Sequence, residues 1–145
     1  MVVDSCLDDY ERLVAAGKAS GIQFTFLKTA EQALRSHAGP SVLVWMINVR
    51  LPCMTGLELF ALLRPRLARV PFLMVDDQYD AARELIVLKV GRLHYVCKPL
   101  DPTWLREKTF CNCPVKPPPL ESWRSAAEAI GHADIADVAD RPVQS

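Results

Sequence analysis

Short apolar runs alternate with amphipathic segments along roughly the first 110 residues of the chain. Five of these runs are apolar or rich in β-branched and aromatic residues, which predicts strands. They lie at residues 2–3, 22–27, 42–47, 71–75 and 93–97. The run at 42–47 contains no polar residue, a pattern typical of a central strand that is covered on both faces.

The segments that follow these runs have helical spacing or helix-start signals. They lie at residues 7–16, 29–36, 57–63 and 80–90, and a fifth helix is expected to begin at 101–103. Thr29 and Gln32 have the spacing of a capping box, in which the hydroxyl accepts from a backbone amide and the Gln side chain reaches back. Gly91 can end the fourth helix in a left-handed conformation, and Pro102 suits the first turn of the fifth.

Strands that alternate with helices through short connections predict an α/β domain with a parallel sheet and helices on both faces. In open sheets of this kind, functional sites form at the carboxyl ends of the strands. Asp4, Asn48, Asp76 and Lys98 all fall at such ends. We therefore expect these four polar side chains to converge at one edge of the sheet.

Composition narrows the classes of partner. Half of the 145 residues are hydrophobic, enough for a core, and 17 basic residues balance 17 acidic ones. A balanced charge gives no bulk attraction to nucleic acid or to an anionic membrane. No apolar run approaches the roughly 20 residues of a membrane-spanning helix, and no basic leader precedes Asp4. These features predict a cytoplasmic protein without direct contact to nucleic acid or membrane.

The last part of the chain, residues 111–145, differs from the rest in composition. Pro114 and the run 117–119 predict a stiff, extended spacer. Residues 120–130 could then form a short helix, with an apolar side made of Trp123, Ala127 and Ile130. Two interpretations stay open: a partly disordered tail, or a helix that docks on the domain or on a partner.

The cysteines give no clear metal or cofactor site. Five cysteines in a chain without a secretory leader are expected to be reduced thiols. Cys111 and Cys113 are one residue apart, unlike the usual ligands of structural zinc, and have no partner pair or nearby histidine. We expect no bound metal and no cofactor.

The stretch Asn48-Val49-Arg50-Leu51-Pro52 leads through a short loop to Gly56 and a helix start. Together with Gly91 and the pair Lys98-Pro99, in this order and at this spacing, it resembles a response-regulator receiver domain. The resemblance covers residues 1–110. It implies the CheY-like, flavodoxin-like fold: a doubly wound, five-stranded parallel sheet with strand order 2-1-3-4-5, followed here by a Pro-rich C-terminal extension.

The resemblance also assigns roles to individual positions. Asp4 matches the first residue of an acidic pair that holds Mg2+, and Ser5 replaces the second acid. Asn48 replaces the phosphoacceptor aspartate, and Arg50 matches the residue whose backbone carbonyl completes the metal shell. Asp76 falls where the family has a threonine or serine that contacts the phosphoryl group. Lys98 matches the lysine that the family has at this position, and Pro99 matches the proline after it. Tyr95 matches the aromatic switch residue.

These replacements predict a degenerate phosphorylation pocket. An amide has no anionic oxygen to attack a phosphohistidine, and of the three family carboxylates only Asp4 remains. Because Mg2+ prefers carboxylate oxygens, metal-assisted phosphoryl transfer is not expected here. Asp76 could pair with the ammonium of Lys98 in place of the phosphate, or both side chains could be solvated. Asp77 is expected at the surface.

The resemblance then implies a pseudo-receiver: a phosphorylation-independent protein-interaction module in two-component (phosphorelay) signal transduction, and not an enzyme. The family's partner face consists of the fourth helix, the fifth strand and the fifth helix, and a homodimer is one option for it. The residues expected there are Ile86, Val87, Val90, Tyr95 and Trp104.

Alternatives to this interpretation stay open. The apolar residues of the fourth helix could belong to the core, and Tyr95 could simply be a half-exposed strand residue. The chain could retain weak Mg2+ or phosphoryl binding. It could also be an enzyme or a small-molecule binder, because a flavodoxin-like sheet supports many functions.

Overall fold

The computed structural model describes residues 1–36, 41–67, 70–91 and 93–105, without the side chains of 104 and 105. Its strands form one parallel sheet in the order β2-β1-β3-β4-β5. They are β1 (Val2–Val3), β2 (Phe26–Leu27), β3 (Trp45–Asn48), β4 (Phe72–Asp76) and β5 (Leu93–Cys97). The predicted α/β fold class and strand order are confirmed.

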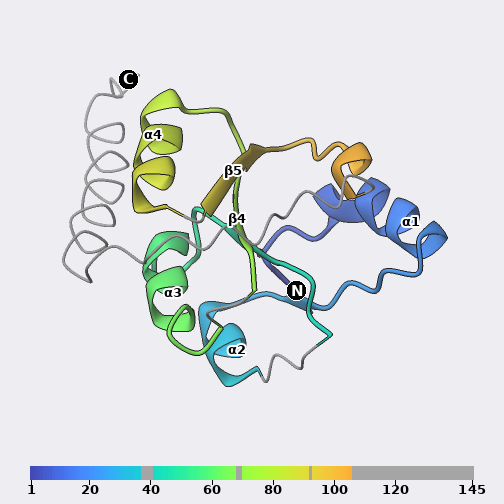
Figure 1. Ribbon diagram of the computed structural model, residues 1–145, viewed down its shortest axis with the longest axis horizontal. Coiled ribbons are helices and arrows are strands. Elements are labelled where there is room, and N and C mark those ends of the chain that lie inside the picture. The colour runs from blue at the N-terminus through green and yellow to red at the C-terminus, as the bar shows by residue number, and fades with distance from the viewer. Residues whose placement is uncertain (37–40, 68–69, 92, 106–145) are drawn as a thin grey trace, which may run out of the picture.

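Helices cover both faces of the sheet (Figure 1). They are the short η1 (Asp8–Tyr10), α1 (Glu11–Ala19), α2 (Ala30–Arg35), α3 (Gly56–Leu63), α4 (Ala81–Val90) and the short η2 (Pro102–Leu105). α1 lies on one side of the sheet, and α2, α3 and α4 lie on the other (Figure 1). The result is a three-layered α/β domain with a separate apolar core on each face of the sheet.

The direction of each strand side chain follows from the pleat of the sheet, in which successive residues point to opposite faces. In β3, Trp45 and Ile47 pack in the core with α2, α3 and α4, whereas Met46 packs on the α1 side. All four residues of β3 are buried, as predicted for a central strand. The same alternation decides which polar residues meet where the strands end.

Two predicted strands are shorter than expected. The run 22–27 contributes only Phe26 and Leu27, because β1 offers a two-residue partner and β2 is an edge strand. In the run 42–47, strand pairing begins at Trp45, which lies opposite Phe72 of β4. The other three strands fall within one residue of the predicted bounds.

Caps define where the helices start. Thr29 accepts a hydrogen bond from the amide of Gln32 as predicted, but the Gln32 side chain accepts from Lys28 N, one residue earlier than a capping box requires. α3 has the complete capping box, formed by Thr55 and Glu58, which sequence analysis missed. Gly91 ends α4 with a φ of +69°, in the positive range that favours glycine.

Several predictions fall on residues outside the described part of the chain. They are the domain boundary at 110, the spacer and tail at 111–145, the helix at 120–130, and the cysteines Cys111 and Cys113. The fifth helix begins where predicted, as η2, and its continuation is outside the described residues. Within the described ranges, no helix has the length and apolar content needed to cross a membrane.

Candidate functional site at the carboxyl edge of the sheet

Three of the four predicted side chains meet on the α1 side of the sheet edge. Asp4 directly follows β1, Asn48 ends β3, and Lys98 directly follows β5. They meet because each lies an even number of residues from a strand residue that packs on the α1 side, such as Val2, Met46 or Val96. The predicted convergence is therefore correct for Asp4, Asn48 and Lys98.

Asp4 is a buried carboxylate with hydrogen-bond donors around both oxygens. Oδ1 accepts from the amide of Cys6 at 2.9 Å. Oδ2 accepts from the Tyr10 hydroxyl at 2.8 Å and from Asn48 Nδ2 at 2.9 Å, and Lys98 Nζ lies 2.8 Å away. With only 1% of Asp4 exposed, these contacts replace the water that an ionised carboxylate would otherwise need.

Asn48 uses both ends of its amide. Nδ2 donates to Asp4 Oδ2 and, at 3.1 Å, to Asp77 Oδ1, and Oδ1 accepts from the amide of Arg50 at 2.8 Å. α3 begins directly against this residue, and a Cβ at Gly56 would collide with the backbone carbonyl of Asn48. An aspartate could not make the two bonds that Nδ2 donates. The amide therefore links two carboxylates that would otherwise repel each other.

Lys98 brings the positive charge of the site. Its Nζ lies 2.8 Å from Asp4, 2.8 Å from Asp9 and 2.7 Å from Asp77, and its side chain is only 8% exposed. Burial alone would lower the pKa of this ammonium, but the hydrogen bonds that it donates to Asp4, Asp77 and Asp9 outweigh burial and raise the pKa. Lys98 is thus a fixed cation that partly neutralises three carboxylates.

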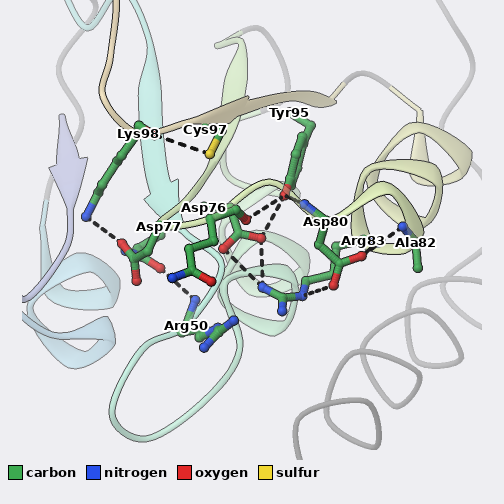
Figure 2. Close-up of polar contacts among 11 residues, drawn as sticks. Arg50, Asp76, Asp77, Asp80, Ala82, Arg83, Tyr95, Cys97 and Lys98 are labelled. Atoms are coloured by element: carbon green, nitrogen blue, oxygen red, sulfur yellow. Dashed lines mark hydrogen bonds and ion pairs between the residues drawn. The ribbon is translucent and has the colours of Figure 1, made fainter. Parts of the chain in front are cut away.

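The predicted pair between Asp76 and Lys98 is wrong. Asp76 is fully buried, and both of its oxygens accept from Arg83 Nη1, at 3.0 and 2.8 Å. Its Oδ2 also accepts from the Tyr95 hydroxyl at 2.8 Å, and Arg83 Nε lies 3.0 Å from Asp80 Oδ2. Figure 2 shows the Asp76 carboxylate turned toward Arg83 and Tyr95, with Lys98 turned toward Asp77.

The pleat explains this separation. Asp76 continues the row of Phe72 and Met74 toward α4, whereas Asp77 points to the opposite face, where Asn48 and Lys98 lie. Asp77 is exposed, as expected, yet it belongs to the site. Counting alternate residues along β4 would have assigned Asp77 to this cluster from the sequence alone.

The site thus consists of two clusters of side chains, one around Lys98 and one around Asp76. Sequence analysis missed three other side chains of these two clusters. Tyr10 and Asp9 come from η1, which the sequence pattern merged into the first helix. Arg83 lies in the first turn of α4, whose start is fixed by Asp80 accepting from the amides of Ala82 and Arg83. The rotation of α4 about its axis decides that Arg83 points inward, and no short motif encodes that rotation.

Tyr95 is held on the α4 side of the sheet. Its hydroxyl donates to Asp76 and accepts from the amide of Asp80 at 3.1 Å. Burial and the hydrogen bond to Asp76 raise the pKa of this phenol. Tyr95 therefore connects β5 to the end of β4 and to the start of α4.

The residues expected on the partner face do not all lie there. Val87 and Val90 are buried in the core, so placing them on an exposed face was wrong, and Ile86 packs partly on the same core. The large apolar residues exposed on α4 are Leu85 and Leu88. Trp104 lies in η2, and its side chain is outside the described residues.

Three further predicted positions lie around the pocket. Ser5, Arg50 and Pro99 are exposed at the ends of their strands. The peptide bond between Lys98 and Pro99 is cis. Arg50 contributes its backbone amide to Asn48, and this loop is closed by a bridge between Arg50 and Thr55.

The pocket does not fit the Mg2+ that the resemblance implies. Among the described residues, no group of three or more Asp, Glu, His or Cys side chains is arranged to hold a metal ion. Hydrogen bonds occupy both oxygens of Asp4, and the Lys98 ammonium stands 2.8 Å from Oδ2. A divalent cation would have to displace these donors and would be repelled by the fixed ammonium.

Comparison with known proteins gives matches to solved structures only. No protein-family model matches the sequence, and no curated protein matches it. A putative response regulator from Chloroflexus aurantiacus is 25% identical, with a TM-score of 0.64 over 75% of this chain and 93% of that chain. A response regulator receiver protein from Pseudomonas putida is 26% identical, with a TM-score of 0.62 over 74% and 90%.

A third structure, the BeF3-activated receiver domain of DrrB from Thermotoga maritima, is 26% identical, with a TM-score of 0.61 over 75% of this chain and 92% of that chain. These neighbours support a role in two-component signalling. Their TM-scores show that the similarity extends to the whole parallel α/β domain. This chain therefore has the fold of a response-regulator receiver domain.

Proposed function

We propose that this chain is a signalling module that acts by binding a protein partner, without phosphorylation at Asn48 and without an enzymatic activity of its own. One observation carries the proposal. The Asn48 amide donates to Asp4 and Asp77, and the Lys98 ammonium contacts the same two carboxylates. Contacts within the chain thus fill the position at which the resemblance to receiver domains implies a metal ion and a phosphoryl group.

The chemistry of these groups opposes phosphorylation. A neutral amide has no anionic oxygen to attack phosphorus. Phosphoryl transfer also depends on cations that neutralise developing charge on the transferred group. Lys98 is the cation of this cluster, and three carboxylates already surround it.

The partner face we propose is formed by α4, β5 and the segment that begins with η2. β5 is an edge strand of the sheet, and α4 exposes Leu85 and Leu88 beside it. Adjacent exposed apolar side chains on one helix are typical of interaction surfaces. Because Tyr95 is hydrogen-bonded to Asp76, this face has a fixed form that does not need a phosphoryl group.

The first experiment tests the absence of phosphorylation. The full chain is incubated with Mg2+ and a small phosphodonor, beside a receiver domain that has an aspartate acceptor, and both are measured by intact mass. We expect an adduct on the control receiver and none on this chain. An adduct of comparable yield on this chain would contradict the proposal and would favour a receiver that retains phosphoryl binding.

The second experiment tests the partner face. The full chain serves as bait in a pull-down, as wild type, as Leu88→Asp and as Leu43→Asp. Leu43 is also exposed but lies before β3, so it is the matched control. We expect a partner that wild type and Leu43→Asp retain and Leu88→Asp loses. Equal retention by all three would place the partner on another face.

A further inference from the structure

β5 forms an edge of the sheet, and the direction of its backbone groups follows from its pairing with β4. Within the described part of the chain, β4 is the only strand that pairs with β5. Lys98 N donates to Asp76 O at 2.9 Å, and Asp76 lies opposite Cys97. In a parallel ladder, every second residue directs both its N–H and its C=O toward the same neighbouring strand. The residues of β5 whose backbone groups point away from β4 are therefore Leu93, Tyr95 and Cys97.

The β5 edge lacks the features by which proteins usually prevent an edge strand from pairing with another chain. Such features are a very short strand, a lysine or proline on the edge, or a bulge. β5 has five residues, all of them in register with β4, and its sequence Leu-His-Tyr-Val-Cys contains no lysine and no proline. The opposite edge strand, β2, has two residues and is followed by the exposed Lys28. β5 is therefore the edge that is suited to accept a further strand.

The outward row of β5 is complementary to the same row of a second copy. In an antiparallel pair centred on Tyr95, the two Tyr95 residues exchange both backbone hydrogen bonds, and Leu93 of each copy does the same with Cys97 of the other. These pairs set an aromatic ring beside an aromatic ring and a large side chain beside a small one. His94 of one copy lies opposite Val96 of the other, so no like charges meet. Because 17 basic residues balance 17 acidic ones, net charge does not oppose self-association.

Exposed apolar side chains lie beside this edge. The ring centroids of Tyr79 and Tyr95 are 6.2 Å apart, and the Tyr79 hydroxyl donates to Glu84 at 2.7 Å. Leu88 follows Glu84 by one helical turn, so it lies on the side of α4 that is nearest to β5. Tyr79 is 64% exposed and Leu88 is 53% exposed. Because a short strand pair alone buries less than the roughly 1,000 Å² of a stable interface, these two side chains have to contribute to the contact.

We propose that two copies of this chain associate through their β5 edges, antiparallel and centred on Tyr95, so that the two five-stranded sheets join into one. α4 of each copy then lies on the same face of the joined sheet, with Leu88 beside the shared edge. The pairing names a second copy as the partner of the face formed by α4 and β5, and in that respect it rests on the proposed function. The association itself is measured without a phosphodonor and without another protein.

Sedimentation velocity of the full chain tests the association, with a reductant present because Cys6 and Cys53 are exposed thiols that form disulfides between molecules. We expect the wild type to change from monomer to dimer between about 1 µM and about 1 mM protein. Cys97→Pro removes an outward N–H at a position where an edge strand tolerates proline, and it should remain a monomer over this range. Cys97→Val keeps the N–H and should dimerise like the wild type.

A variant outside the strand carries the test if the proline variant does not fold. Leu88→Asp places a charge at an exposed position beside the shared edge, and it should raise the dissociation constant of the dimer by about tenfold or more. Leu43 is also exposed but lies before β3, so Leu43→Asp is the matched control and should dimerise like the wild type. Urea melts report whether each variant is folded.

Hydrogen exchange at single amides measures which backbone groups pair. From dilute to concentrated wild type, exchange of the outward amides of Tyr95 and Cys97 should slow on the order of tenfold. The amides of His94 and Val96 face β4 and should not change.

Three results would each overturn the pairing. They are a wild type that stays monomeric, a folded Cys97→Pro variant that dimerises like the wild type, and protection of Tyr95 and Cys97 that does not depend on concentration. A monomeric chain whose pull-down partner is lost in Leu88→Asp would overturn the pairing and leave the proposed function standing. A phosphoryl adduct on a chain that dimerises as described would do the reverse.

Discussion

Arg83 Nη1 donates to both carboxylate oxygens of Asp76, at 3.0 and 2.8 Å. This ion pair connects the first turn of α4 to the end of β4. Asp76 is fully buried and Arg83 is 9% exposed. Removing one partner of such a pair leaves a buried charge without its counterpart. The pair therefore constrains which substitutions the α4 side of the sheet edge can accept.

The first prediction follows from that burial. Arg83→Met should lower the free energy of unfolding by about 3 to 5 kcal/mol, measured by urea denaturation at neutral pH. The matched control is Arg35→Met, which breaks an exposed pair with Glu31 and should cost less than about 0.5 kcal/mol. Equal effects of the two substitutions would mean that burial does not strengthen the Asp76 contact.

The second prediction concerns the partner of Lys98. A double-mutant cycle with Asp4→Asn and Lys98→Met should give a coupling energy above about 0.5 kcal/mol, because the two charged groups are in contact. The cycle with Asp76→Asn and Lys98→Met should give about 0.3 kcal/mol or less, as for independent sites. Urea melts of the single and double variants give both coupling energies. A larger coupling energy for Asp76 and Lys98 than for Asp4 and Lys98 would contradict the placement of Asp76 and Lys98 in separate clusters.

The third prediction concerns alkaline pH. Burial and the hydrogen bond to Asp76 raise the pKa of Tyr95 in the folded state above its unfolded value of about 10. A group with a raised folded pKa contributes stability that is complete below its unfolded pKa and is lost as pH rises toward the folded pKa. The free energy of unfolding should therefore fall above about pH 10, and less steeply in Tyr95→Phe.

Urea melts between pH 8 and 11 measure this slope. Tyr10 and Lys98 also have raised pKa values, through burial for Tyr10 and through carboxylate hydrogen bonds that outweigh burial for Lys98. Some alkaline loss should thus remain in Tyr95→Phe. An unchanged slope in this variant would show that the Tyr95 hydroxyl is not held by Asp76 in solution.

The fourth prediction tests the close approach of α3 to Asn48. Gly56→Ala should destabilise the domain by about 1 to 3 kcal/mol, because its Cβ meets the backbone carbonyl of Asn48, which cannot turn aside. In Gly17→Ala the new Cβ meets mainly the ring of Phe24, a side chain that can move, and alanine favours the helix. Gly17→Ala should therefore cost less. Thermal or urea melts compare the two variants directly.

Sequence analysis placed the sheet and most of the pocket for clear physical reasons. Apolar runs and caps located the strands and helix starts, and the rule that sites form at carboxyl ends brought Asp4, Asn48 and Lys98 together. The Asp76 pairing failed because the alternation of side chains within β4 was not counted.

Other features depend on geometry that short patterns do not carry. Arg83 reaches Asp76 because of how α4 is rotated about its axis, and the same rotation buries Val87 and Val90 and exposes Leu85 and Leu88. A run of apolar residues in a helix shows that one side is buried, but the neighbouring elements decide which side.

The most direct test of the account measures the thermal melting temperature of the full chain with and without millimolar Mg2+, and the same pair of melts for Asn48→Asp. In wild type, Asn48 and Lys98 already partner the carboxylates, so the two melts should coincide. Asn48→Asp places a further carboxylate against Asp4 and Asp77, so it should melt lower and regain stability with Mg2+. A rise of about 4 °C or more in wild type, roughly 1 kcal/mol of binding-linked stability, would contradict the claim that internal contacts have taken the place of the metal.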